Sequence, residues 1–212
     1  MIGLVNLLAF LGLLTALLAV WRQSRPGRLR LFMLQSVLLA ALAAVIAVFS
    51  GHYDLLGVAV AFAVIKVGVI PRVLARITLG TVRPVTPGRS MGIALLVAGG
   101  LVVVSYVVML PVMTVTSLPT AGAIPLAFAA ALIGLFVCVR GQDAFTHILG
   151  FLIFENGVFG LALLGAYGLP LIVEAGVFLD VLVIVLIMEG VVVQIRREHA
   201  SIEVDRLREL RG

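Results

Sequence analysis

Long apolar runs separated by short polar segments dominate the pattern of residues along this chain. Each run is near the ~20 residues that an α-helix needs, at ~1.5 Å per residue, to cross ~30 Å of hydrocarbon. The pattern therefore predicts an all-α integral membrane protein with seven transmembrane helices. Their expected bounds are 2–21, 31–50, 55–77, 91–110, 121–139, 144–169 and 170–195.

The seven helices are expected to form a single domain over residues 1–195, followed by a charged tail at 196–212. The first apolar run has full spanning length and no basic segment before it, so it is predicted to be a retained helix rather than a signal peptide. Pro111, Pro119 and the Ser and Thr residues between them predict an outer loop at 111–120.

Composition narrows the class of protein further. Hydrophobic residues make up 63% of the chain and charged residues only 12%, which excludes an ordinary soluble domain. Cys138 is the only cysteine, so the chain has no intrachain disulfide and no cysteine cluster for a metal or an iron–sulfur group. No glycine-rich phosphate loop is present either, so we expect no cofactor to be bound by this chain.

The distribution of arginine predicts the orientation in the membrane. With seven helices, all fourteen arginines fall on one side of the bilayer, and the opposite loops carry no Lys or Arg. The positive-inside rule then places the N-terminus outside and the C-terminus in the cytoplasm, in a cell inner (plasma) membrane. The net charge of +5 is explained by these loops and gives no reason to expect nucleic-acid binding. The arginines are Arg22, Arg25, Arg28, Arg30, Arg72, Arg76, Arg83, Arg89, Arg140, Arg196, Arg197, Arg206, Arg208 and Arg211.

Three charged residues lie near the middle of separate apolar runs: Lys66, Glu155 and Asp180. One central charge costs about 2.5–3.5 kcal/mol on insertion scales, so such residues are expected to face a shared polar interior. Lys66 is the only lysine, and its expected counter-ion is Glu155 or Asp180. The arrangement predicts an ion or proton path, with a purely structural ion pair as the alternative.

Other polar residues extend this candidate path. Loss of water around Glu155 favours its neutral form, which suits a proton-exchanging group, and the adjacent Asn156 could support it by holding water. Glu174 is a candidate outer exit, and His147 is a candidate inner uptake point because it lies one turn after Asp143. Glu189 is expected near the inner boundary.

Several segments resemble component E of hydrogenase-4. They are Phe154 to Gly157, Gly168 to Glu174, Asp180 to Val183, Asp205 to Arg208 in the tail, and Lys66 with Ile70 and Pro71. The resemblance implies a membrane-arm subunit of a group 4 [NiFe] hydrogenase or formate hydrogenlyase-type complex, related to respiratory complex I.

The same resemblance likens residues 121–195 to the three-helix K-type subunit of complex I, which has buried glutamates in its second and third helices. Glu155 matches the first of these glutamates, while Glu174 and Asp180 bracket the second. The implied partners are antiporter-like subunits and other membrane-arm subunits. This chain would link the antiporter-like subunits to the redox arm. It would contribute buried charged residues to proton translocation and have no redox site of its own. The alternatives are a free-standing small ion transporter or channel and a structural membrane spacer.

Overall fold

The computed structural model describes residues 1–77 and 90–166, all of which belong to one compact unit, Met1–Val177. The described residues fold into α-helices, one π-helical segment and one short 3-10 turn. The α-helices are α1 (Ile2–Trp21), α2 (Arg25–Ser50), α3 (Asp54–Ala63), α4 (Ile70–Ile77), α5 (Ser90–Val115), α6 (Ile124–Arg140) and α7 (Ala144–Ala166). The π segment (Val64–Val69) joins α3 to α4 without a break, and the 3-10 turn (Ala121–Ala123) precedes α6.

Six helical stretches of the described residues are long and apolar enough to cross a membrane, with α3, the π segment and α4 counting as one. They correspond to the first six predicted helices, so the helical prediction is confirmed there. The seventh predicted helix, 170–195, and the tail, 196–212, lie outside the described residues.

Two predicted boundaries are wrong. Helix α2 begins at Arg25 rather than 31, with Pro26 in its first turn, where a proline costs no hydrogen bond. Helix α5 continues through Pro111 to Val115, so the predicted loop at 111–120 is helical in its first half. Proline removes one backbone N–H donor but is tolerated inside membrane helices.

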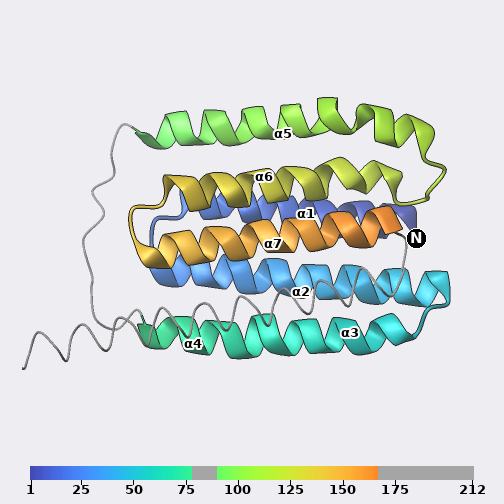
Figure 1. The fold of residues 1–212 in the computed structure, drawn as a ribbon, viewed down its shortest axis with the longest axis horizontal. Helices are drawn as coiled ribbons and strands as arrows, with labels where there is room; N and C mark the ends of the chain where they lie inside the picture. Colours follow the sequence, from blue (N-terminus) through green and yellow to red (C-terminus); the bar gives the residue numbers. More distant parts are fainter. Residues whose placement is uncertain (78–89, 167–212) are drawn as a thin grey trace, which may run out of the picture. The chain divides into compact units, whose positions relative to one another are not determined.

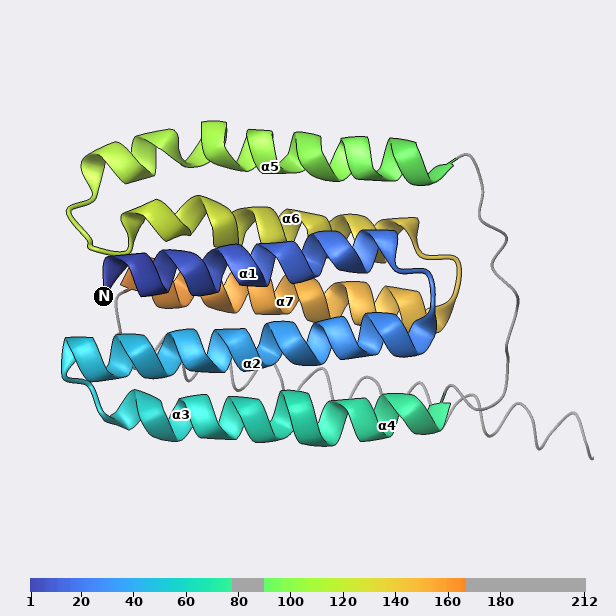
Figure 2. The same ribbon diagram turned by 180° about the vertical axis from the view of Figure 1, so that it is seen from behind.

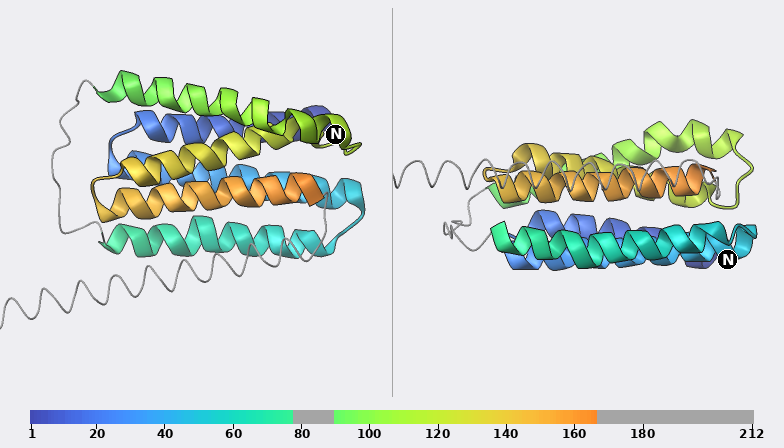
Figure 3. Two further views of the ribbon diagram at one scale, coloured as in Figure 1. Left: turned by 45° about the horizontal axis from the view of Figure 1, so that its top comes forward. Right: turned by 60° about the horizontal axis from the view of Figure 1, so that its bottom comes forward.

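The helices of this unit lie in two layers. Helices α1, α2 and α3–α4 lie side by side in one layer, and α5, α6 and α7 lie in the other (Figures 1 and 3). Across the layers α1 packs on α6 and α2 packs on α7 (Figure 2). Among the described helices of spanning length, α5 is the least buried and turns an apolar face outward: Leu96 is 77% exposed and Val107 is 61% exposed. Such a face suits a lipid environment.

Helices α6 and α7 pack closely because glycines lie where they meet. A Cβ atom on Gly134 of α6 would overlap the backbone of Phe154, and one on Gly150 of α7 would overlap the backbone of Cys138. Gly157 of α7 faces the backbone of Ala131 in the same way. Small residues allow such close approach, which is a main source of helix association in membranes. This close packing fixes the position of the middle of α7, where Glu155 lies.

We expect Gly157→Ala to destabilise the protein by about 1–3 kcal/mol, since the added methyl group must push α6 and α7 apart. Gly165→Ala is the matched control, because a Cβ there meets nothing within 4 Å in the described residues and the change in helix propensity is the same. Chemical unfolding in detergent micelles measures both. Equal stability of the two variants would show that the close contact between α6 and α7 contributes nothing.

Candidate functional site

A buried ion pair joins the π segment to α7. The Nζ of Lys66 lies 3.2 Å from Oε2 of Glu155. The Lys66 side chain has no exposed surface, and that of Glu155 is 2% exposed. Glu155 is the twelfth of the 23 residues of α7, and Lys66 is equally central between Asp54 and Ile77. The expected pairing of Lys66 with Glu155 is therefore present, midway along two helices of spanning length.

Two further groups hold the ammonium of Lys66. It donates a hydrogen bond of 2.8 Å to Oδ1 of Asn156, and its nitrogen lies 4.6 Å from the centre of the Phe62 ring. The Phe62 ring in turn stacks on Phe159 of α7, with ring centres 4.5 Å apart. A carboxylate, an amide oxygen and an aromatic face all stabilise a positive charge. These three groups hold the end of the Lys66 side chain in place.

The backbone at Lys66 is π-helical, which the sequence pattern did not reveal. Pro71 lies just after the π segment, and a proline ring in a regular α-helix clashes with the carbonyl four residues earlier, here that of Val67. The wider π turn around Val67 accommodates the proline without breaking the helix. π segments within α-helices are rare and frequently occur at functional sites.

Asn156 connects the ion pair to α2 and α1. Its Nδ2 donates to Oε1 of Gln35 at 3.1 Å and to Oγ of Ser36 at 3.0 Å. Ser36 donates to the carbonyl of Phe32 at 2.9 Å, and Nε2 of Gln35 lies 3.4 Å from the carbonyl of Gly12. Each of these hydrogen bonds is donated in the direction away from Lys66. The network therefore fixes the Asn156 amide with its oxygen toward the ammonium.

Gln35 and Ser36 were not predicted as site residues. Gln35 is 4% exposed and Ser36 is fully buried. The sequence feature that could have identified them is that they are two adjacent polar residues within the apolar run of α2. Polar side chains within a membrane helix usually bond to a neighbouring helix, as these two do.

The structure does not bring His147 to the ion pair. Its side chain is exposed near the start of α7, with Nδ1 2.7 Å from the carbonyl of Cys138. Glu155 lies eight residues further along, about 12 Å at the rise of an α-helix. Asp143 instead caps α7, since its Oδ1 accepts a hydrogen bond from the backbone N–H of Thr146 at 2.9 Å. The predicted site residues Glu174, Asp180 and Glu189 lie outside the described residues.

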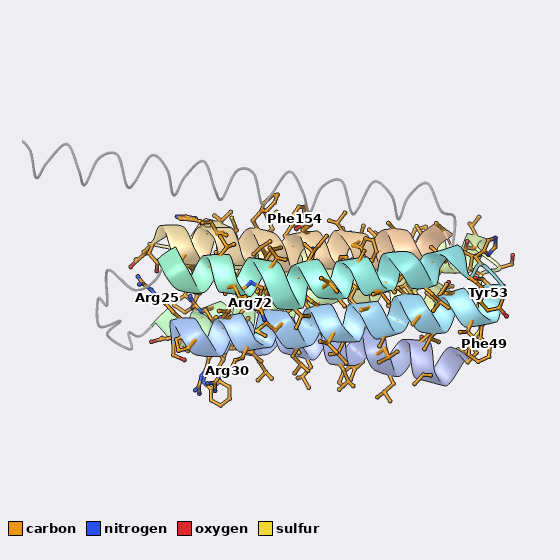
Figure 4. All side chains as sticks on the ribbon, turned by 90° about the horizontal axis from the view of Figure 1, so that it is seen from below. Arg25, Arg30, Phe49, Tyr53, Arg72 and Phe154 are labelled. Atoms are coloured by element: carbon orange, nitrogen blue, oxygen red, sulfur yellow. The ribbon has the colours of Figure 1, made fainter. Side chains whose placement is uncertain are left out.

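Arginines of the described part gather toward one end of the helices. Figure 4 shows Arg25, Arg30 and Arg72 toward that end, and Phe49 and Tyr53 at the other. Arg25 also lies 3.9 Å from Asp143 at the start of α7. This arrangement agrees with loops that alternate between the two sides of a membrane.

A buried pair of this kind can exist in two charge states. When Glu155 is ionised, it and Lys66 attract each other across 3.2 Å. When Glu155 takes up a proton, the attraction falls while Asn156 and Phe62 still hold the ammonium. The protonation of each partner therefore depends on the charge of the other, which is the property required of a group that passes protons in a controlled way.

The helices and the buried pair together define a helical membrane protein with a central charged site. The chain belongs to the family of Rv0085, an uncharacterised protein of Mycobacterium tuberculosis: the two are 33% identical over 201 residues, which cover 93% of this chain and 91% of the relative. It is also similar to hydrogenase-4 component E of Escherichia coli K12, with 26% identity over 212 residues that cover 99% of this chain and 98% of the relative. The component E of Shigella flexneri shows the same similarity.

No model of a protein family matches the chain. No solved structure matches it significantly. The relationship to the two bacterial proteins therefore rests on sequence, and it extends over nearly the whole chain.

Proposed function

We propose that this chain is a membrane-arm subunit of a hydrogenase-related, complex I-like assembly and that its Lys66–Glu155 pair takes part in proton translocation. One observation carries the proposal: a lysine and a glutamate are paired at 3.2 Å, buried, and central in two helices of spanning length. Ionisable residues at that depth are costly and typically mark ion or proton pathways. The similarity to hydrogenase-4 component E supplies the kind of assembly.

In this proposal the proton is received and released by Glu155, and Lys66 sets how strongly the carboxylate holds it. Protonation of Glu155 weakens the ion pair, and release of the proton restores it. A redox reaction elsewhere in the assembly would drive the alternation. Asp180 would belong to the same path, Glu174 would serve as its outer exit and His147 as its inner uptake point, with Glu189 in a supporting role.

The remaining features of the proposal concern placement. The chain lies in the cell inner membrane with its N-terminus outside and its C-terminus in the cytoplasm, because its arginine-bearing loops then face the cytoplasm. It contacts antiporter-like subunits and links them to the redox arm. The exposed apolar face of α5 is available to lipid or to such a membrane neighbour.

Affinity purification of the tagged chain from its native membrane in mild detergent tests the assembly. We expect it to copurify with a [NiFe] large subunit and antiporter-like chains, and to be inert when purified alone and placed in liposomes. Ion flux through the chain alone would instead establish a free-standing transporter or channel. Recovery of the chain without any membrane partner would contradict the proposed assembly.

A further inference from the structure

A small cavity, open on one side, lies beside the hydrogen-bond network, on the side of Asn156 that faces α1 and α6. Its volume is about 30 Å³, and residues of α1, α2, α6 and α7 line it. Figure 2 shows these four helices next to one another, with α1 in front of α7. A cavity needs about 10–15 Å³ to hold one water molecule, so this one has room for about two.

The cavity wall is apolar except at one side. Gln35 and Asn156 line it there, together with Gly12, whose carbonyl accepts the long hydrogen bond from Gln35. An apolar cavity stays dry, whereas water enters a cavity that offers it several polar partners. These three groups provide both donors and acceptors at one place.

The hydrogen bonds of Gln35 leave capacity for a ligand. Its amide nitrogen carries two N–H groups, and within the described residues it makes one hydrogen bond, the 3.4 Å contact with the carbonyl of Gly12. The side chain is only 4% exposed. A second buried N–H group without a partner is costly, and a water molecule in the adjacent cavity would satisfy it.

The amide groups themselves do not pass protons along the network. Asn156 and Gln35 have no proton that they release at ordinary pH, and the hydroxyl proton of Ser36 is held by the Phe32 carbonyl. A proton that leaves the Lys66–Glu155 pair toward α1 and α2 therefore requires water. The cavity provides a site for that water next to Asn156.

We propose that this cavity is a water-binding site and that Gln35 is its positioning residue, holding both the water and the Asn156 amide. The role of this water in proton transfer rests on the proposed function. The presence of the water does not. The water would be part of the proton path, leading from the ion pair toward the space between α1, α2, α6 and α7. Gln35 acts through Asn156 and does not touch Lys66 or Glu155 in the described contacts.

Two variants separate the water from the hydrogen bonds. Gln35→Leu removes the amide that would hold the water. Gly160→Ala leaves every side chain of the network in place, and its added methyl group lies 3.3 Å from Leu39 and 3.5 Å from Ala127, both of which line the cavity. Gln142→Leu is the matched control, because it makes the same change at an exposed residue outside the cavity.

The test combines a high-resolution cryo-electron microscopy map of the complete assembly with proton translocation in membrane vesicles. We expect density for one or two water molecules within hydrogen-bonding distance of Gln35, lost in Gln35→Leu and Gly160→Ala. Both variants should lower the rate of proton translocation roughly fivefold or more, which corresponds to the loss of one buried hydrogen bond. Gln142→Leu should leave it unchanged.

Density for a lipid acyl chain in the cavity, or no water density there, would overturn the inference, as would full proton translocation in Gly160→Ala and Gln35→Leu. Glu155→Gln distinguishes these failures from failure of the proposed function. If that variant loses coupling while the two cavity variants keep it, the ion pair works without the cavity water. If Glu155→Gln keeps full coupling, the proposed proton path is contradicted. In that case the cryo-electron microscopy density by itself tests whether water binds in the cavity.

Discussion

Glu155→Gln is expected to lower proton translocation by the assembled complex about 100-fold or more, the scale on which loss of one proton-transferring group acts. The amide is close in size to the carboxyl group and can still accept a hydrogen bond from Lys66, while Asn156 and Phe62 continue to hold the ammonium. Assembly should therefore be intact. Proton uptake by inverted membrane vesicles during redox turnover, with subunit content checked by gel, measures the effect.

Asp143→Asn is a suitable control for that experiment. It removes an acid from the start of the same helix, and asparagine caps α7 as aspartate does. We expect normal proton translocation in this variant. A fully assembled Glu155→Gln complex that translocates protons as well as the Asp143→Asn complex would remove Glu155 from the path.

Lys66→Met should destabilise the protein by about 3–5 kcal/mol, because it leaves the buried carboxylate of Glu155 without the ammonium. The double variant Lys66→Met with Glu155→Leu should recover most of this loss, since apolar replacement of both partners of a buried pair is often neutral or stabilising. Unfolding free energies in detergent micelles give both values.

The same pair of variants separates a proton-exchanging pair from a static clamp. Restored stability in the double variant should not restore proton translocation if protons pass through the pair. A clamp, in contrast, predicts that the double variant folds, assembles and translocates protons normally. That outcome would support the structural-spacer alternative.

The positions of the first six helices could be predicted because each apolar run has spanning length. The runs also gave the depth of Lys66 and Glu155, since residue number converts directly into height along a helix. They could not give the rotation of each helix about its axis. For that reason the sequence alone names two possible counter-ions for Lys66, and the described residues show the contact with Glu155.

Other features depend on contacts between helices and leave only a weak trace in the sequence. Nothing in the sequence distinguishes Gly134 and Gly150 from the other glycines, of which the chain has 22 in all. The structure shows that each lies against the backbone of a neighbouring helix. The end of α5 was predicted too early because Pro111 usually ends a helix in water, whereas this helix continues past it. Gln35 became part of the site only through its hydrogen bond with Asn156, 121 residues away.

The most direct test of the central claim is an infrared difference spectrum of the assembled complex between its resting and turning-over states. If Glu155 takes up and releases a proton during turnover, the spectrum should contain the carbonyl band of a protonated carboxyl group that is absent from the Glu155→Gln complex. A spectrum in which the two complexes have identical carboxyl bands during turnover would contradict the account.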